Sequence, residues 1–257
     1  MLAESTVHLS LGLGFLQEII HQPTGSLLAR ALLRWGHFVG GIAWIGMLYF
    51  FNLVNVPLQK SLDADTKKKV NPLLLSKALW YFRWGSVVTV FAGLTYYAMY
   101  ILAVEARAAG LQPFLYLAIW LGIVLVTYTI LFGLYQIPAL TGDGRILAVV
   151  VAIVMIAMSA VVIYIFGNAG TDGKFLGNKS ISIGIGGGMG IIMLANVWSI
   201  IWPTQRRGLS ALEKGTPAPT PAEMRKAFLA SRTNAWLSLP MLFFMGTSHG
   251  DWVLFGK

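Results

Sequence analysis

The sequence predicts an all-α integral membrane protein, a polytopic bundle of about six transmembrane helices preceded by a short N-terminal interfacial helix. Of its 257 residues, 56% are hydrophobic and only 11% are charged, and the mean hydropathy is +0.70. A soluble domain carries roughly a quarter charged residues. Several apolar segments also reach the roughly 20 residues that one bilayer crossing needs. We therefore expect residues 1–257 to form a single membrane domain in contact with the lipid bilayer.

The predicted spans are separated by polar, proline-rich or glycine-rich connectors. Residues 7–21 are too short and too interrupted to cross a bilayer, which favours an interfacial helix. Pro138 is expected to end the third span and Pro203 the fifth, because proline interrupts helical hydrogen bonding. The six spans are expected at about 28–56, 75–104, 113–137, 146–166, 181–202 and 233–250.

Basic residues are distributed unevenly over the two sides of this arrangement. The connectors between spans one and two, three and four, and five and six hold thirteen of the nineteen Lys and Arg residues. The positive-inside rule then places these connectors in the cytoplasm and both termini on the opposite side. The same rule explains the net charge of +9 without a nucleic-acid partner, for which no motif is present. The N-terminus has neither a basic start nor a small-residue cleavage site, so no signal peptide is expected.

Two spans differ from ordinary lipid-facing helices. The fifth contains five glycines between Gly184 and Gly190, which permit very close helix packing in a membrane bundle. The fourth is almost uniformly apolar and is expected to face lipid or a partner subunit.

Histidines are the main candidates for a chemical role. His37 lies within the first span among small residues, and an ionisable ring in a membrane is a functional-site hypothesis by default. His249 lies at the outer end of the last span. Two histidines from different helices suit axial ligation of the iron of a b-type haem. The alternative is that His37 bonds a backbone carbonyl and His249 is an interfacial residue. His8 and His21 are weaker candidates for a ligand or a haem-propionate partner.

Other residues near His37 fit the same hypothesis. Arg30 and Arg34 lie four residues apart on one helix face, where they are expected to hold haem propionates or an anionic substrate, or else to extend toward lipid phosphates. Trp44 is placed to stack on a macrocycle or to pack in the core. The sequence contains no cysteine, which excludes thiolate metal sites and covalent attachment of a c-type haem.

Several function classes lack their characteristic residues. The sequence has no serine–histidine–acid arrangement, no P-loop and no pair of intramembrane carboxylates. It also shows no repeat of its two halves, which disfavours a transporter. Catalytic residues are not identified by these patterns.

Three segments resemble one family, the membrane domain of the bacterial cytochrome-linked urate hydroxylases, also described as the urate oxidase N-terminal domain. They are LLRWGHFVGGIAWIGMLYFF, MLANVWSIIWPTQRRGLSALEKG and SRTNAWLSLPMLFFMGTSHGDW, in the family's order. The resemblance implies a multi-pass protein of the bacterial cytoplasmic membrane, in which the positive-inside rule places both termini in the periplasm. It singles out His37, Trp44, Asn196, Gln205, Arg206, Asn234, Pro240 and His249.

The resemblance implies a redox or electron-transfer subunit, and at most a urate-hydroxylase-like enzyme acting on a small anionic substrate. Thr233 stands where the family pattern has a histidine, and Gly85 and Ser86 stand where a polar residue is expected. Family members commonly carry a c-type cytochrome, whereas this sequence has no cysteine to attach one. A separate c-type cytochrome, or another membrane subunit, is therefore the expected partner. The alternative is a non-catalytic structural subunit of a larger respiratory or photosynthetic complex.

Overall fold

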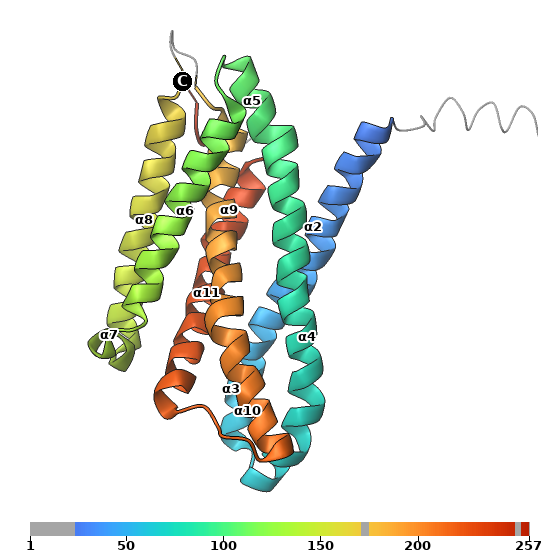
Figure 1. Cartoon of the computed structure of the whole chain (residues 1–257), viewed down its shortest axis with the longest axis vertical. Helices are drawn as coiled ribbons and strands as arrows, with labels where there is room; N and C mark the ends of the chain where they lie inside the picture. The colour runs from blue at the N-terminus through green and yellow to red at the C-terminus, as the bar shows by residue number, and fades with distance from the viewer. Residues whose placement is uncertain (1–23, 171–174, 250–252, 257) are drawn as a thin grey trace, which may run out of the picture.

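The structure is a computed structural model that describes residues 24–170, 175–249 and 253–256. Within these residues the regular structure is entirely helical, in seven continuous segments, most of which run roughly along a common axis (Figure 1). The all-α prediction is therefore confirmed for the described chain. The predicted interfacial helix at 7–21, with His8 and His21, lies outside the described residues.

Three of the segments contain a π-helical turn, which widens the helix locally. The first comprises α2 (Gly25–Tyr49), η1 (Phe50–Asn55) and α3 (Val56–Ser61). The second comprises α4 (Ala64–Tyr96), η2 (Tyr97–Leu102) and α5 (Ala103–Ala108). Next are α6 (Pro113–Leu134), α7 (Pro138–Gly142) and α8 (Gly144–Gly167). The last two are α9 (Asn178–Asn196) with η3 (Val197–Ile201) and α10 (Trp202–Lys214), and α11 (Pro221–Thr247).

Five of these segments are long and apolar enough to cross a membrane: Gly25–Ser61, Ala64–Ala108, Pro113–Leu134, Gly144–Gly167 and Asn178–Lys214. They contain the predicted spans 28–56, 75–104, 146–166 and 181–202, whereas the helix of the third span, predicted at 113–137, ends at Leu134. The sixth span, predicted at 233–250, is not among the five; it begins within α11, which ends at Thr247 and runs along the bundle beside α9 (Figure 1). Its first half is less apolar because it carries charged and amide side chains, including Arg232 and Asn234.

Helix boundaries differ from the prediction at Pro203. The helix of the fifth span does not end there but continues as α10 to Lys214, and Gly215, with a φ of +66°, ends it. A π-helical turn, η3, ends at Ile201, two residues before Pro203. We attribute the continuation to this widened turn, because proline cannot donate the backbone hydrogen bond of a regular α-helix. The connector expected between the first two predicted spans is likewise mostly helical, and only Leu62 and Asp63 separate α3 from α4.

The glycine-rich helix α9 lies at the centre of the bundle. In the apolar stretch of its continuous segment, Asn178–Lys214, 78% of the residues are buried. A Cβ atom on Gly184 would lie 3.2 Å from the Tyr97 hydroxyl, and one on Gly186 would lie 3.0 Å from the Met241 carbonyl oxygen. Both distances are shorter than nine in ten real Cβ contacts. The prediction that these glycines permit close packing is therefore confirmed.

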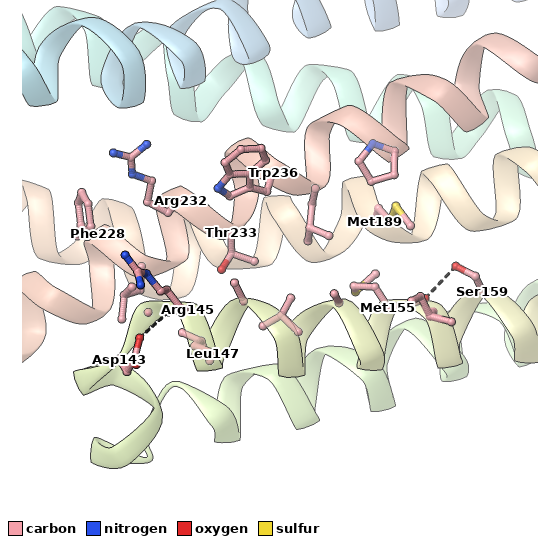
Figure 2. Close-up of a pocket in the computed structure, with 18 of the residues that line it drawn as sticks. Asp143, Arg145, Leu147, Met155, Ser159, Met189, Phe228, Arg232, Thr233 and Trp236 are labelled. Atoms are coloured by element: carbon pink, nitrogen blue, oxygen red, sulfur yellow. Dashed lines mark hydrogen bonds between the residues drawn. The ribbon is translucent and has the colours of Figure 1, made fainter.

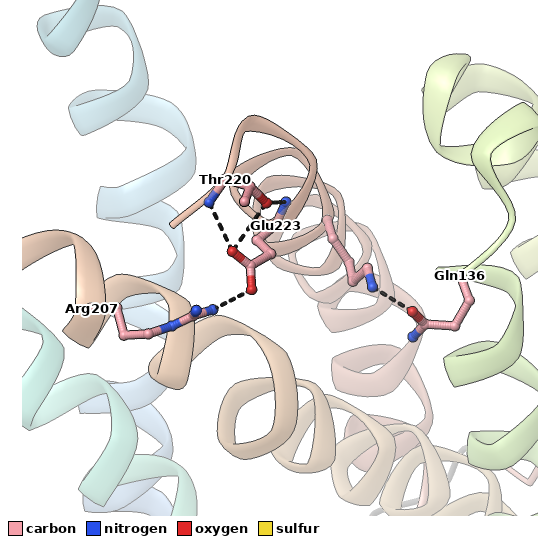
Figure 3. A network of polar contacts seen from close by, with 5 residues as sticks. Gln136, Arg207, Thr220 and Glu223 are labelled. Carbon is pink, nitrogen blue, oxygen red and sulfur yellow. Dashed lines mark hydrogen bonds and ion pairs between the residues drawn. The ribbon is translucent and has the colours of Figure 1, made fainter. Parts of the chain in front are cut away.

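The α10–α11 connection is held by a small polar network at one end of the bundle. The Thr220 hydroxyl accepts a hydrogen bond from the Glu223 backbone N–H, and the Glu223 carboxylate accepts one from the Thr220 N–H. Arg207 of α10 donates to the same carboxylate over 2.7 Å (Figure 3). These reciprocal bonds satisfy backbone donors at the start of α11.

The basic connectors gather at that same end. The turn between α3 and α4, helix α7, and the junction of α10 with α11 lie together, whereas α5 and the C-terminus lie at the opposite end (Figure 1). The three connectors that the sequence analysis assigns to the cytoplasm therefore lie at one end of the described chain.

Candidate functional site

The seam between α2 and α4 is built from small residues that bring the two backbones together. A Cβ atom on Gly40 would lie 2.9 Å from the Thr89 backbone nitrogen, and one on Gly85 would lie 3.1 Å from the Gly40 carbonyl oxygen. Neither atom can move away without shifting a helix. Small residues therefore set the distance between the helices, as they do at other membrane helix interfaces.

His37 lies in this seam, where its ring is oriented by the backbone of α4. Its Nδ1 atom lies 2.8 Å from the Thr89 carbonyl oxygen. A carbonyl only accepts hydrogen bonds, so Nδ1 carries the proton and Nε2 keeps its lone pair. The carbonyl bond predicted as the structural alternative for His37 is thus present. The same bond is also the usual way in which a protein orients a metal-binding histidine through its other nitrogen.

Gly93 makes room for the His37 ring. A Cβ atom at Gly93 would lie 2.5 Å from Nδ1 and 2.7 Å from Cε1 of the ring. In the described chain, Nε2 of His37 forms no hydrogen bond. The seam therefore holds the ring by one nitrogen and leaves the other available.

Arg30 and Arg34 lie on the same face of α2 as His37, nearer its N-terminus. Their guanidinium carbons lie 5.4 Å from the ring centre of Tyr100 and 5.9 Å from that of Tyr96, respectively. Both arginines are exposed, and no carboxylate of the described chain pairs with either. The aromatic rings position the two cations while leaving their N–H groups free for an anion.

Trp44 lies two helical turns beyond His37, in the core rather than at the edge of a pocket. It is 1% exposed and packs in the main hydrophobic cluster. Its indole Nε1–H is nevertheless buried without a hydrogen-bond partner. Buried donors are nearly always paired, so this atom indicates a place for an additional acceptor such as water or a ligand oxygen.

His249 occupies a different place from His37. It is exposed at the end of α11, and its Nδ1 lies 2.7 Å from the Ser248 hydroxyl and 3.3 Å from the Met245 carbonyl oxygen. No hydrogen bond or ring contact of the described chain joins it to His37. The structure therefore places one candidate ligand within the seam and the other, exposed, at a helix end.

Beyond Trp44, the C-terminal end of α2 and the following turn η1 contact α11. Tyr49 shares a hydrogen bond of 2.9 Å with Ser238, and the Asn52 side chain donates to the Leu48 carbonyl and to Ser231. Asn52 is buried and lies in the π-helical turn η1. These bonds tie the first helix to the last.

Two of the residues singled out by the resemblance meet in the bundle core. The Asn196 side chain on α9 donates to the Asn234 side-chain oxygen on α11 over 2.9 Å, and Asn234 donates to the Met193 carbonyl. Asn196 Oδ1 has no hydrogen-bond partner, and neither does the nearby Tyr135 hydroxyl. Thr233 lies beside this hydroxyl. The hydrogen bond between Asn196 and Asn234 fixes the register of α9 against α11.

The remaining residues of that set lie elsewhere. Gln205 and Arg206 are on α10, at the basic end of the bundle, and Arg206 lines a small surface hollow of ≈ 580 Å³ with Arg207. Pro240 is inside α11 and faces the groove between α8 and α11. None of them contacts the His37 seam.

The α4 residues that complete the seam are not among those predicted from the sequence. Thr89 orients His37, Gly93 accommodates its ring, and Tyr96 and Tyr100 support the arginines. A signal was present, because Gly85, Thr89 and Gly93 recur every four residues, the spacing of small residues on one face of a packed membrane helix. Such a spacing predicts a close interface, although it does not identify the partner helix.

The residues present fit an axial haem ligand at one position. His37 donates a hydrogen bond through Nδ1, and its Nε2 is available. Two arginines without a carboxylate partner, Arg30 and Arg34, lie on the same helix face. Within the described chain, no cluster of three or more His, Cys, Asp or Glu residues forms an alternative metal site.

Comparison with known families matches residues 64–256 to the urate oxidase N-terminal domain. The matched region begins at the first residue of α4, so it includes Asn196, Asn234 and His249, whereas α2 with His37 precedes it. No curated protein and no solved structure gives a significant match. Because the match covers most of the sequence, the chain belongs to the urate oxidase N-terminal family.

Proposed function

We propose that this protein is a membrane redox subunit in which His37 is an axial ligand of a b-type haem, working with a separate cytochrome. The observation that carries the proposal is the hydrogen bond from His37 Nδ1 to the Thr89 carbonyl. This bond fixes the tautomer and the ring orientation that a metal-binding histidine requires. When bound, a b-type haem supplies one-electron transfer.

Arg30 and Arg34 support the anionic side of the same proposal. Each is held over a tyrosine ring and has no carboxylate partner in the described chain. Guanidinium groups bind carboxylates through paired N–H donors, so these residues suit haem propionates or a small purine-like anion. The unpaired indole N–H of Trp44 adds a buried donor two turns further along α2.

The second axial ligand is proposed to be His249. Its Nδ1 is also held by local hydrogen bonds, which leaves Nε2 as the coordinating atom. Because His249 lies at the end of α11, its participation requires α11 and the N-terminal half of α2 to approach each other. His8 and His21 are the competing ligands from the N-terminal segment.

Reduced-minus-oxidised absorbance spectra test the proposal. The purified protein should show a b-type spectrum, and His37→Ala should abolish it, whereas Gly46→Ala, on the same helix with no atom within 4 Å of the added methyl, should retain it. Loss in His249→Ala as well would establish two histidine ligands, and retention would assign the second ligand elsewhere. A wild-type protein that binds no haem under any reconstitution condition would refute the redox function. Urate turnover with a c-type cytochrome as acceptor is the assay that follows a positive spectrum.

A second candidate function is a structural subunit of a larger membrane complex, and the surface of α2 favours it. Helix α2 packs on α4 and exposes large apolar side chains on its other side, with Trp35 66% and Ile42 74% exposed. An exposed patch of this kind marks either lipid contact or a protein interface. Co-purification with membrane subunits, together with loss of the protein when they are absent and no haem spectrum, would support this function over the first.

A further inference from the structure

A long groove lies between α8 and α11, away from the His37 seam. Its volume is ≈ 1400 Å³, and Met189 of the central helix α9 lies at its floor. On the α8 side, small residues such as Ala148, Ala152 and Ala160 hollow out the wall. The facing wall is formed by α11 side chains, among them Trp236 and Pro240 (Figure 2).

The groove has the length and the polarity of a site for hydrocarbon chains. Its lining on α8 extends from Arg145 to Ile163, which at 1.5 Å per residue corresponds to ~27 Å, close to the ~30 Å hydrocarbon core of a bilayer. Ile156 and Trp236 are 68% and 67% exposed, so apolar surface lies open along it. A hydrophobic surface at this depth must be covered by lipid chains or by another protein.

One end of the groove is strongly basic. Arg145 at the start of α8, and Arg225 and Arg232 on α11, all line it there, together with a single carboxylate, Asp143 (Figure 2). Arg225 is anchored by hydrogen bonds from Nε to the Thr141 carbonyl and from Nη2 to the Gly142 carbonyl. The positive charge at this end therefore exceeds the negative charge.

The other two guanidinium groups lack an anionic partner in the described chain. Asp143 uses a carboxylate oxygen to cap the Arg145 backbone N–H, and the Arg145 side chain forms no ion pair. Arg232 stacks on Phe228, with 5.3 Å between its guanidinium carbon and the ring centre. Two unpaired cations at the end of an apolar groove are complementary to a molecule with an anionic head and an apolar tail.

We propose that the α8–α11 groove binds an anionic phospholipid, with its phosphate between Arg145 and Arg232 and an acyl chain along the α8 wall. Basic pockets between membrane helices on the cytoplasmic side are suited to such headgroups. The groove's charged end coincides with the end of the bundle where the basic connectors gather (Figure 1). A zwitterionic lipid also has a phosphate, but its own ammonium group offsets that charge, so it neutralises the two guanidinium groups less well than a lipid of net negative charge. A second copy of this chain would bring its own basic surface to the same place.

Native mass spectrometry of the delipidated protein, titrated with phosphatidylglycerol or with phosphatidylcholine of the same acyl chains, tests this proposal. Each arginine near an anionic headgroup changes affinity roughly fivefold, so Arg145→Gln with Arg232→Gln should weaken phosphatidylglycerol binding about 30-fold. Phosphatidylcholine binding should change little. The matched control is Lys68→Gln with Lys69→Gln, which removes the same charge from exposed positions at the start of α4 and should leave binding unchanged.

A second pair of variants tests where the acyl chain lies. Ala152→Phe fills the groove wall and should reduce bound phosphatidylglycerol, whereas Ala157→Phe, exposed on the same helix but outside the groove, should not. Arg145, Ala152, Arg232 and Ala157 are all exposed or partly exposed, so these substitutions are expected to leave the protein folded. Thermal unfolding of each variant without added lipid verifies this.

Three results would overturn the proposal. The first is equal affinity of the wild type for the two lipids. The second is an equal loss of binding in the lysine control, which would indicate a diffuse charge effect. The third is a dimer mass that disappears in Ala152→Phe while lipid binding persists, which would assign the groove to a second copy of the chain.

Discussion

Gly93→Ala is expected to displace the His37 ring and destabilise the protein. The added Cβ would lie 2.5 Å from Nδ1 and 2.7 Å from Cε1, so the ring must leave its place and its bond to the Thr89 carbonyl. The lost hydrogen bond costs about 1 kcal/mol and the overpacking about 1–3 kcal/mol. Alanine recovers about 1 kcal/mol of helix propensity. The net loss in the free energy of unfolding is therefore about 1–3 kcal/mol.

The control is Gly46→Ala on α2, where the new methyl group has no atom within 4 Å. It gains the same propensity without a clash, so it should be stabilised by up to about 1 kcal/mol. Titration of the detergent-solubilised protein with a denaturing detergent, followed by circular dichroism, gives both values. Gly93→Ala should also shift or remove any haem spectrum, whereas Gly46→Ala should preserve it.

A double-mutant cycle isolates the ring contact. In a His37→Ala background the steric conflict is absent, so Gly93→Ala should cost no more than the Gly46→Ala control. If Gly93→Ala destabilises equally with and without the ring, the contact between Gly93 and His37 is not the cause. If Gly93→Ala is as stable as the control in the wild-type background, the geometry of the seam described above is wrong.

Three further outcomes follow from the structure. Hydrogen bonds from Arg207 and from Thr220 at the start of α11 lower the pKa of Glu223 from 4.5 to about 2. The ionised Glu223 carboxylate therefore contributes its full stabilisation above pH about 4.5, and this stabilisation is lost as the pH falls toward 2. Glu223→Gln should make the thermal unfolding temperature depend less on pH across that range. Gly186→Ala should destabilise by about 1–3 kcal/mol because of the backbone carbonyl 3.0 Å away, whereas Gly187→Ala, with its nearest contact at 3.6 Å, should not, as equilibrium unfolding can show. Asn234→Leu leaves its buried amide partner on α9 unpaired and should cost about 1–3 kcal/mol in the same measurement; an unchanged unfolding midpoint would contradict the assigned hydrogen bond.

Much of the fold was predictable because the bilayer imposes a strong constraint on the sequence. Backbone groups cannot remain unpaired in hydrocarbon, so long apolar runs become helices regardless of the details of packing. The glycines of α9 likewise predicted a closely packed central helix. The boundary at Pro203 was not predictable in this way, because the π-helical turn that precedes it depends on the surrounding packing rather than on local propensity.

The candidate site was predictable only in part, for a related reason. His37, Arg30 and Arg34 stand out because charged or ionisable groups are rare in apolar segments. The residues that orient them do not, since Thr89 contributes a backbone carbonyl and Gly93 contributes the absence of a side chain. Such roles arise from the pairing of two helices, and no composition or spacing in α2 alone specifies its partner.

The placement of the two histidines gives the redox proposal a definite structural requirement. His37 is on α2, which precedes the family-matched region and joins α11 through polar bonds at Tyr49 and Asn52, whereas His249 is at the far end of α11 within that region. Between those bonds and the two histidines, α2 packs on α4 and exposes an apolar surface. His37 faces α4 in the seam, whereas Trp35 and Ile42 lie on the opposite, exposed side of α2, so a haem held at His37 would not cover them. That surface is therefore left for lipid or for a partner subunit with either ligand set. The spectra of His37→Ala and His249→Ala decide the ligand set, and co-purification with other membrane subunits decides whether the exposed face of α2 is an interface.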